Sequence, residues 1–451
     1  MTNLPRGAAF IIEKLESAGF EAWVVGGCVR DSLLGLAPHD WDICTNARPE
    51  ETLAVFAAQR VIQTGVKHGT VTVLYEGEPY EVTTYRTDGA YTDSRRPDTV
   101  DFVSNVKDDL SRRDFTVNAM AYHPQRGLFD AFCGEDDLKN KVIRCVGDAK
   151  ARFEEDALRI LRAMRFAATY GFTIEENTAN ALLSCKERLR LIAPERIREE
   201  LLRLLNGVGA AEILRAFAPV LFVFLPELAP MRGLDQHNPY HYLDVWEHTL
   251  AAISAAPRDP VIRLTMLLHD AGKPASFFMD EKGVGHFYGH PEVSLKIAKA
   301  VLERLRFDNQ TRREVEELVL FHDAAIPAKQ KNVLKWLNRV GEERFRQLLP
   351  VKRADAAAQH PAKRQAKLED ISRLEACLNN VLERGHPYRL KDLNITGNDL
   401  SAIGVAPGKQ LGDILQTLLI KVMEGKLKND KAALLEAALK IHTNNGQAFI
   451  E

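Results

Sequence analysis

Apolar residues in the first 150 positions follow two different periods. Short apolar runs bounded by Gly, Pro or Asp are typical of β-strands, and four of them lie at 22–25, 71–75, 81–86 and 100–103. Between the strands, apolar residues three or four positions apart predict helices at 6–18 and 49–58. The pattern therefore predicts that the chain begins with a small head of mixed α and β structure.

Beyond residue 148, almost every apolar stretch has the period of a helix. One apolar stripe is formed by Phe153, Leu158, Leu161 and Met164. Further helices are predicted at 195–218, 243–256 and 260–269. Pro, Gly and His are frequent in 226–242, which predicts a linker or loop. The predicted fold class is α+β, with a small N-terminal head on a mixed sheet followed by a long all-α neck, body and tail.

The composition is that of a folded protein with a core of normal size. Of the 451 residues, 45% are hydrophobic and 27% are charged, which excludes wholesale disorder. The longest apolar run, 216–225, contains Pro219 and is far shorter than a membrane span. The six cysteines form no CxxC pair, so reduced thiols packed as small hydrophobic residues are expected. We expect a cytoplasmic protein without a membrane partner.

The charges are almost balanced, with 60 Lys and Arg against 62 Asp and Glu. On average this balance argues against a nucleic-acid partner, because binding a polyanion usually needs a basic surface. Locally the bases exceed the acids, by six to four over 186–203 and by more over 352–367. The local excess predicts one basic track for RNA on an otherwise mixed surface.

Gly26 and Gly27 stand between a predicted strand and a predicted helix. Two glycines let the backbone approach a phosphate closely, and the free N–H groups at the start of a helix bind anions. Arg30 adds a positive charge one turn into the helix. A plain tight turn is the alternative, and the Gly-Gly pair alone does not exclude it.

Asp40 and Asp42 are two residues apart, so in an extended segment their carboxylates point to the same face. Like charges this close are costly unless a cation lies between them, and Mg²⁺ binds one or two carboxylates together with substrate phosphates. Glu81 opens a later predicted strand and could supply a third carboxylate, as a metal ligand or as the base for an attacking hydroxyl. The alternatives are a solvated Asp-rich turn and an ordinary exposed strand glutamate.

These motifs and several later ones occur in an order that resembles one known family. The further motifs are the loop from Asp88 to Val100, the block from Arg112 to Met120, Glu155-Asp-Ala-Leu-Arg159 and Glu195-Arg-Ile-Arg-Glu199. With the glycine turn and the paired aspartates, they look like the class II tRNA nucleotidyltransferases (CCA-adding enzymes) and the related bacterial poly(A) polymerases. The resemblance is close from about residue 20 to 205.

The resemblance implies a polymerase-β-like nucleotidyltransferase head in which Asp40 and Asp42 hold two Mg²⁺ ions and act in catalysis together with Glu81. It also implies a nucleotide site that holds the triphosphate, the ribose and the base. The residues of that site would be Gly26, Gly27, Arg30, Arg112, Arg113, Asp114, Asn118, Glu155, Asp156, Arg159 and Arg162.

Different residues of the block from Arg112 to Met120 would bind different parts of the nucleotide. Arginine binds phosphate with a fixed fork of donors, so Arg112 or Arg113 suits the triphosphate. Asp114 and Asn118, the latter on a predicted helix, could bond the ribose hydroxyls. A capped helix with solvated arginines is the alternative.

Asp156 and Arg159 lie three apart on one predicted helix and therefore share a face. Cytosine and adenine both present an exocyclic amine beside a ring-nitrogen acceptor, and one carboxylate with one guanidinium matches that edge. Uracil and guanine present the opposite order of donor and acceptor. By resemblance this pair selects C and A, and Glu155 braces the arginines. A surface ion pair is the alternative.

Asp88, Tyr91, Arg95 and Arg96 belong to a loop that resembles the flexible element of family members with full CCA activity. Members limited to adding CC are shortened there. The complete loop favours the addition of all three nucleotides.

The predicted helical body carries a second, separate pattern. In chain order it consists of His248, His269, Asp270, His290, His322 and Asp355. This order resembles the HD-domain metal phosphohydrolases, which implies one metal shared by the adjacent His269 and Asp270 with His248 and Asp355. The two remaining histidines would build a second site. The implied cofactor is a divalent transition metal, and buried structural histidines are the alternative.

The sequence as a whole predicts an enzyme that adds CCA to the 3′ end of tRNA from CTP and ATP by two-metal nucleotidyl transfer, with release of pyrophosphate. The alternatives are a poly(A) polymerase and an HD-type phosphohydrolase acting on nucleotide or RNA phosphates. Four domains are expected: a head (1–150), a neck with the base-recognition helix (151–228), a body with the HD motif (229–368) and a tail that binds the tRNA elbow (369–451). Nothing in the sequence predicts the oligomeric state.

Overall fold

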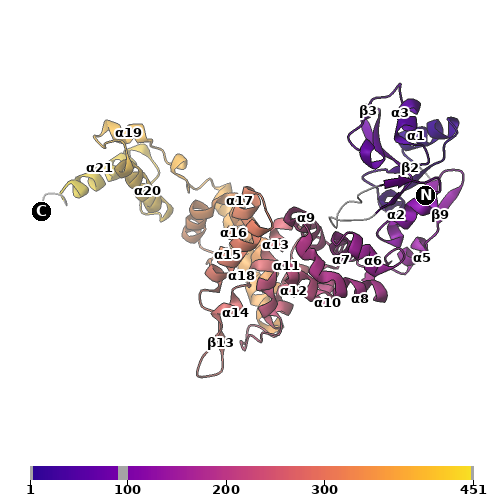
Figure 1. Ribbon diagram of the computed structural model, residues 1–451. Coiled ribbons are helices and arrows are strands. Elements are labelled where there is room, and N and C mark those ends of the chain that lie inside the picture. The colour runs from indigo at the N-terminus through magenta and orange to yellow at the C-terminus, as the bar shows by residue number, and fades with distance from the viewer. Residues whose placement is uncertain (1–3, 90–99, 448–451) are drawn as a thin grey trace. The chain divides into compact units, whose positions relative to one another are not determined.

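The fold is taken from a computed structural model, which describes residues 4–89 and 100–447 (Figure 1). The chain divides into two compact units. Unit 1 comprises Met1–Ala229 and Val301–Phe307, and unit 2 comprises Pro230–Ala300 and Asp308–Glu451. Within the described ranges, no helix is both long enough and apolar enough to cross a membrane.

Unit 1 begins with a mixed sheet of seven strands in the order β3-β4-β5-β2-β1-β8-β9. The strands are β1 (Ala22–Val25), β2 (Ile43–Thr45), β3 (Val61–Ile62), β4 (Thr70–Tyr75), β5 (Glu78–Thr84), β8 (Met120–His123) and β9 (Gly127–Asp130). Only β2 and β5 pair in parallel, and the other neighbours are antiparallel. A mixed sheet in the head was predicted from the sequence and is confirmed.

The position of β2 in the middle of the sheet places the candidate site. On one side Ile43 pairs with Val24 of β1, and on the other it pairs with Val82 of β5. The residues just before β2 therefore lie beside the end of β1 and beside Glu81. Because β1 and β2 are buried along their whole length, this edge of the sheet rests on a fixed core.

Short helices and strands surround this sheet. They are α1 (Arg6–Ser17), α2 (Gly27–Leu33), α3 (Pro49–Val55), β6 (Arg86–Asp88), β7 (Val100–Phe102), α4 (Val106–Ser111) and α5 (Gly134–Lys139), with 3-10 turns at Val66–His68 and Thr116–Asn118. The apolar face of α1 carries Ile11 and Leu15, which are fully buried. The predicted helices at 6–18 and 49–58 correspond to α1 and α3.

The neck is helical, as predicted. Its elements are β10 (Val142–Ile143), α6 (Ala149–Glu155), α7 (Leu158–Tyr170), β11 (Thr173–Ile174), α8 (Glu176–Cys185), α9 (Pro194–Leu205), α10 (Ala210–Ala216) and α11 (Ala218–Phe224), with 3-10 turns at Lys186–Leu191 and Pro226–Met231. Gly171 ends α7 in the left-handed conformation, with φ 67°.

One sequence-based expectation is wrong here, because Asp156 and Arg159 are not on one helix. Asp156 has extended backbone angles, φ −138° and ψ 103°, and stands between α6 and α7. The apolar stripe that begins at Phe153 therefore runs over two helices. The apolar period continues across the break, which is why periodicity did not reveal it.

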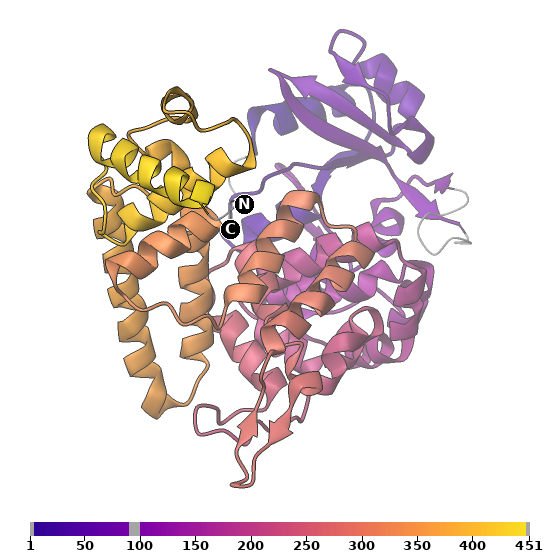
Figure 2. The ribbon, with the colours of Figure 1, turned by 90° about the vertical axis from the view of Figure 1, so that its left-hand side faces the viewer.

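Unit 2 consists mainly of helices. They are α12 (Val245–Ala255), α13 (Pro260–Leu268), α14 (Lys273–Ser276), α15 (His290–Arg304), α16 (Asn309–Phe321), α17 (Gln330–Ala357), α18 (Pro361–Glu383), α19 (Gly397–Ala402), α20 (Lys409–Met423) and α21 (Lys431–Gln447), with a 3-10 turn at Leu390–Asp392. The hairpin of β12 (Phe278–Met279) and β13 (Gly285–His286) projects from these helices (Figure 2). Apolar side chains from α17 to α21 form one continuous core.

Candidate functional site

Gly26 ends β1 and turns the chain into α2. Its φ of 81° lies in the left-handed region that favours glycine. A Cβ atom at this position would stand 2.7 Å from Nη1 of Arg113. The glycine therefore lets a guanidinium approach the backbone at the start of a helix, where a phosphate can be bound.

Three predicted carboxylates converge on this turn. Asp40 and Asp42 precede β2, and the backbone carbonyl of Asp42 accepts a hydrogen bond of 2.9 Å from the N–H of Val25. Burial raises the pKa of Asp42, the nearby Arg113 opposes this effect, and the charges of Glu81 and Asp40 raise the pKa further. Asp40 and Glu81 thus both act electrostatically on Asp42, and the role of the three acids as metal ligands stays a prediction.

These carboxylates lie near one another but do not form a compact set of three metal ligands. Among the described residues, the groups with three ligand atoms within 4.8 Å of one another lie in unit 2. Oxygen donors that leave space for further ligands fit a hard divalent cation, which keeps water and substrate oxygens in its shell. The donor set of Asp40, Asp42 and Glu81 therefore fits such a cation.

Asp109 holds the two arginines beside the turn, a role that the sequence analysis missed. Its carboxylate is fully buried and accepts a 3.0 Å hydrogen bond from Nε of Arg112. Arg113 lies 3.6 Å from its other oxygen. The sequence signal was present, because Asp109 stands three and four residues before the two arginines at the end of α4. Arg113 is the arginine that faces both the glycine turn and the acids.

Asp114 is the centre of a buried hydrogen-bond network. One carboxylate oxygen accepts bonds from the N–H of Phe115 at 2.9 Å and from the side chain of Asn118 at 3.0 Å. The other accepts two bonds from Arg162, at 2.8 and 2.6 Å. Burial by itself raises the pKa of Asp114, but Arg162 and Asn118 outweigh this and lower it to about 2. Asn118 lies on a 3-10 turn rather than on the predicted helix.

Arg30 is occupied by contacts within the protein. Its Nη1 donates to the side-chain oxygen of Asn118, and its Nε donates to Asp31 at 2.8 Å. The guanidinium lies 5.0 Å from the ring centre of Phe166 and 4.9 Å from that of Tyr170. Tyr170 also donates its hydroxyl to Asp31 at 2.9 Å. Arg30 thus joins α2 of the head to α7 of the neck, and its predicted contact with the triphosphate stays a prediction.

The break between α6 and α7 gives Asp156 two partners. One oxygen accepts the N–H of Leu158 at 3.0 Å and so caps the start of α7. The other accepts Nη2 of Arg196 at 3.0 Å. Arg196 of α9 was not among the predicted site residues. It fixes the orientation of Asp156, which the spacing of residues within the motif could not show.

Arg159 is held from both sides of the head–neck junction. Its Nη1 donates to Glu155 at 2.5 Å, and its Nη2 donates to the carbonyl of Arg112 at 3.2 Å. Glu155 is also paired with Arg152 at 2.9 Å. Glu155 thus holds Arg159 close to the arginine block. Of the predicted loop residues, Asp88 ends β6, and Tyr91, Arg95 and Arg96 lie outside the described residues.

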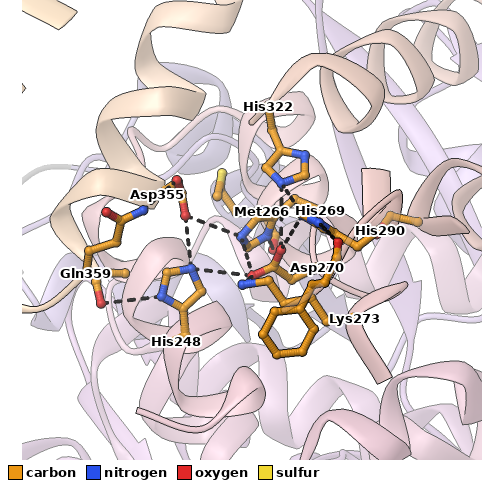
Figure 3. Close-up of polar contacts among 12 residues, drawn as sticks. His248, Met266, His269, Asp270, Lys273, His290, His322, Asp355 and Gln359 are labelled. Carbon is orange, nitrogen blue, oxygen red and sulfur yellow. Dashed lines mark hydrogen bonds and ion pairs between the residues drawn. The ribbon is translucent and has the colours of Figure 1, made fainter. Parts of the chain in front are cut away.

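A second group of predicted residues comes together in unit 2 (Figure 3). His248 on α12, His269 and Asp270 after α13, His290 at the start of α15, His322 after α16 and Asp355 on α17 surround one point. One oxygen of Asp270 lies 3.5 Å from Nε2 of His248 and 3.3 Å from Nε2 of His269. The other lies 3.4 Å from His290 and 3.6 Å from His322.

The helix ends set the tautomers of these histidines. The last carbonyls of a helix lack partners within the helix, and Nδ1 of His269 and of His322 meets such carbonyls at 2.7 Å each. A carbonyl can only accept, so each Nδ1 carries a proton, and in the neutral ring each Nε2 presents a lone pair to Asp270. His290 is held in the same way by the carbonyl of Phe287 at 2.9 Å. Orientation of this kind is typical of metal-binding histidines.

The arrangement leaves lone pairs facing one another. Nε2 of His290 and Nε2 of His322 are 3.2 Å apart, and neither carries a proton if Nδ1 donates in both. Nε2 of His269 is buried and makes no hydrogen bond within the described residues. Two sets of three residues could each hold a metal ion: His248, His269 and Asp270, and Asp270, His290 and His322. The residues present therefore fit a pair of cations that share Asp270.

Lys273 and His241 are two further residues of this cluster that the sequence analysis did not single out. Lys273 lies 2.8 Å from Asp270 and donates to Gln236 at 2.8 Å. Burial raises the pKa of Asp270, but His269 and Lys273 outweigh it and hold the pKa well below its usual value. The ring of His241 stands 4.8 Å from that of His248, and burial lowers the pKa of His241 to about 3.

Known protein families match three parts of the chain. The poly A polymerase head domain matches residues 22–144. The probable RNA- and SrmB-binding site of polymerase A matches 171–230, and the putative domain 2 of tRNA nucleotidyltransferase matches 289–438.

Individual proteins resemble the chain along its whole length. The CCA-adding enzyme of Lactobacillus delbrueckii subsp. bulgaricus is 36% identical over 97% of this chain and 99% of its own. That of Leuconostoc mesenteroides is 34% identical over 96% of each chain. The solved structure of the Bacillus stearothermophilus CCA-adding enzyme in complex with CTP is 28% identical, with a TM-score of 0.76 over 99% of this chain and 100% of that one. The chain belongs to the family of CCA-adding enzymes.

Proposed function

We propose that the chain adds CCA to the 3′ end of tRNA from CTP and ATP and releases pyrophosphate. The observation that carries the proposal is that Asp40, Glu81 and Arg113 all act electrostatically on Asp42, while the guanidinium of Arg113 lies at the Gly26 turn. Relatives of nearly the same length are CCA-adding enzymes. The solved relative with the TM-score of 0.76 is a complex with CTP.

The residues of the head suit a nucleoside triphosphate. Mg²⁺ bound by Asp40 and Asp42 would lower the pKa of the attacking 3′-hydroxyl and neutralise the leaving oxygens. Arg113, anchored by Asp109, would bind the triphosphate at the glycine turn. Asp114 and Asn118 would bond the ribose hydroxyls, and Asp114 would have to exchange one of its present partners, Phe115, Asn118 or Arg162, to do so.

Base selection is assigned to Asp156 and Arg159. A carboxylate accepts from the exocyclic amine of C or A, and a guanidinium donates to the adjacent ring nitrogen. Both side chains are held by neighbours, Asp156 by Arg196 and Arg159 by Glu155. A fixed donor and acceptor reject U and G, because the mismatched groups would be left without partners.

The test is to incubate the protein with Mg²⁺, tRNA lacking its 3′ end, and each labelled NTP in turn. Ordered addition of two C and one A is the expected result. Long A tails would instead identify a poly(A) polymerase, and phosphate release without extension would contradict nucleotidyl transfer.

Glu81 offers a matched pair of variants within β5. We expect Glu81→Gln to lower the rate of transfer by about a hundredfold if it takes the proton of the attacking hydroxyl. Glu78 is exposed on the same strand, and Glu78→Gln should leave the rate unchanged. Equal rates in both variants would remove Glu81 from the mechanism.

We propose a second, metal-dependent phosphohydrolase activity for the cluster around Asp270. The supporting observation is the pair of lone-pair nitrogens 3.2 Å apart beside a shared carboxylate. Metal analysis of the purified protein should find a divalent transition metal, reduced in His269→Ala. Protein that contains no metal in either form would contradict the proposal.

Each of the four expected domains has its own proposed role. The head (1–150) carries the transfer chemistry, the neck (151–228) selects the base, the body (229–368) carries the second centre and the tail (369–451) binds the tRNA elbow. A cytoplasmic location suits a tRNA substrate and the free cysteines.

A further inference from the structure

A chain of hydrogen bonds leads from the neck to the side-chain amide of Asn118. Tyr170, the last residue of α7, donates its hydroxyl to Oδ1 of Asp31 at 2.9 Å. The same oxygen accepts Nε of Arg30 at 2.8 Å and lies 2.8 Å from its Nη2. Nη1 of Arg30 in turn donates to the side-chain oxygen of Asn118. The two outer members, Tyr170 and Asp31, are half-buried, and the two inner ones are buried.

Arg30 determines which way the amide of Asn118 faces. A guanidinium can only donate, so the amide oxygen faces Arg30 and the NH₂ group faces Asp114, to which it donates at 3.0 Å. The amide nitrogen carries two hydrogens, and within the described residues the second one has no acceptor. Asn118 is only 6% exposed. A buried donor without an acceptor is unfavourable, and an oxygen of a bound ligand would satisfy it.

Tyr170 holds Arg30 with its ring and Asp31 with its hydroxyl. The ring of Tyr170 and that of Phe166, one turn earlier on α7, are nearly parallel, with an interplanar angle of 8°. The guanidinium of Arg30 lies 4.9 and 5.0 Å from the two ring centres. Burial raises the pKa of the Tyr170 hydroxyl to about 12, so at neutral pH it keeps its proton and donates. The change from Tyr to Phe therefore removes the hydrogen bond and leaves the ring contact.

We propose that Tyr170 is a positioning residue for recognition of the ribose of the incoming nucleotide. Its hydroxyl fixes Asp31 and Arg30, and these fix the amide of Asn118 so that its second hydrogen binds the oxygen of the 2′-hydroxyl. Without the hydroxyl of Tyr170 the carboxylate of Asp31 can rotate, and the amide is no longer held in one orientation. The proposal rests on the nucleotide binding proposed above for the head.

Binding of CTP and of 2′-deoxy-CTP to the full-length protein tests the proposal. Calorimetric titration in Mg²⁺ without RNA measures binding in the absence of transfer. The readout is the ratio of the two dissociation constants, because a merely structural change weakens both ligands alike. The native chain should bind CTP about tenfold more tightly, the effect of one well-placed hydrogen bond. In Tyr170→Phe this preference should fall about threefold, through weaker binding of CTP alone.

Two comparisons show whether the effect passes through Asn118. Tyr85 is a matched control, because it is a buried tyrosine of the same unit whose hydroxyl donates to the carboxylate of Glu21 at 3.2 Å, and Tyr85→Phe should leave the ratio unchanged. In protein that already carries Asn118→Ala, Tyr170→Phe should have no further effect on the ratio. Thermal unfolding shows whether each variant is folded. Asp31→Asn weakens the same link and replaces Tyr170→Phe if that variant does not fold.

The outcomes separate this inference from the proposed transfer reaction. An unchanged ratio in Tyr170→Phe would overturn the role of Tyr170, even if Asn118→Ala abolishes the preference for CTP. An equal fall in Tyr85→Phe, or a further fall in the Asn118→Ala protein, would overturn the route through the amide. A native chain that binds both ligands equally would overturn the inference outright. Protein that shows the expected ratios but adds no nucleotide to tRNA would keep the inference and contradict the transfer.

Discussion

Single residues set the geometry of the nucleotide site, and Gly26 is an example. Its positive φ and the closeness of Arg113 each disfavour a side chain at this position. Gly35 has a similar φ of 73°, and a Cβ there would meet nothing within 4 Å. Comparing these two glycines therefore separates backbone strain from loss of the arginine contact.

We expect Gly26→Ala and Gly35→Ala to lower the free energy of unfolding by a similar amount, roughly 1–2 kcal/mol, from left-handed strain. Only Gly26→Ala should also raise the KM for CTP and ATP, because the new Cβ displaces Arg113. Denaturant unfolding and initial-rate kinetics on the same samples check both parts. An unchanged KM in Gly26→Ala would show that Arg113 does not bind the triphosphate.

Asp114 gives a pH-dependent prediction. Its folded-state pKa, about 2, lies below the ordinary value of 3.8, so its ionisation stabilises the fold above about pH 4 and this contribution is lost as the pH falls towards 2. The shift corresponds to about 2 kcal/mol. Asp114→Asn should therefore be less stable than the native chain at pH 7, and the difference should shrink below pH 4. A difference that stays constant from pH 7 to 3 would contradict the assignment.

At the scale of elements, the functional geometry depends on where helices and strands stop. Apolar periods and bounding residues predicted part of the head, and β1 was predicted to the residue, whereas β2, β8 and β9 were not predicted. The break at Asp156 was missed, because its cause is the cap that the carboxylate makes on α7 and the bond to Arg196 on another helix. Arg196 escaped prediction for the same reason, since tertiary partners are not visible in local spacing. Asp109 was also missed, although its spacing to Arg112 and Arg113 is local and could have indicated it.

Arg196 on α9 should control fidelity through Asp156. We expect Arg196→Ala to raise misincorporation of UTP and GTP about tenfold, because a carboxylate without its charge-assisted partner can reorient. Arg203 is exposed on the same helix, and Arg203→Ala should leave fidelity unchanged. Single-turnover incorporation assays with each NTP measure the effect, and equal fidelity in both variants would place base selection elsewhere.

At the scale of the whole molecule, the residues of the two proposed centres lie in two separate compact units. Both residue sets were selected from the sequence because their order along the chain is distinctive. The sharing of Asp270 by two sets of ligands and the nearby Lys273 depend on how helix ends meet. The sequence could not show them.

We expect a mutation in either proposed centre to leave the function of the other unchanged. Asp42→Ala should lower CCA addition by a thousandfold or more, on the order of a lost metal ligand, while the metal content of the cluster stays the same. His269→Ala should lower the metal content of the cluster and leave CCA addition unchanged. Incorporation assays and metal analysis on both variants check this, and loss of both properties in either variant would show that the centres depend on each other.

The shared carboxylate of Asp270 also has an evolutionary consequence. Because both candidate metal sites use it, one codon change at this position removes the second centre as a whole, whereas a change at His290 removes half of it. The residues of the nucleotidyltransferase centre lie in the other unit, so selection on tRNA maturation would not oppose such a change. A lineage would therefore lose the proposed second activity in a single step while it keeps nucleotidyl transfer, and related chains that lack Asp270 would be expected to lose the remaining five residues by drift.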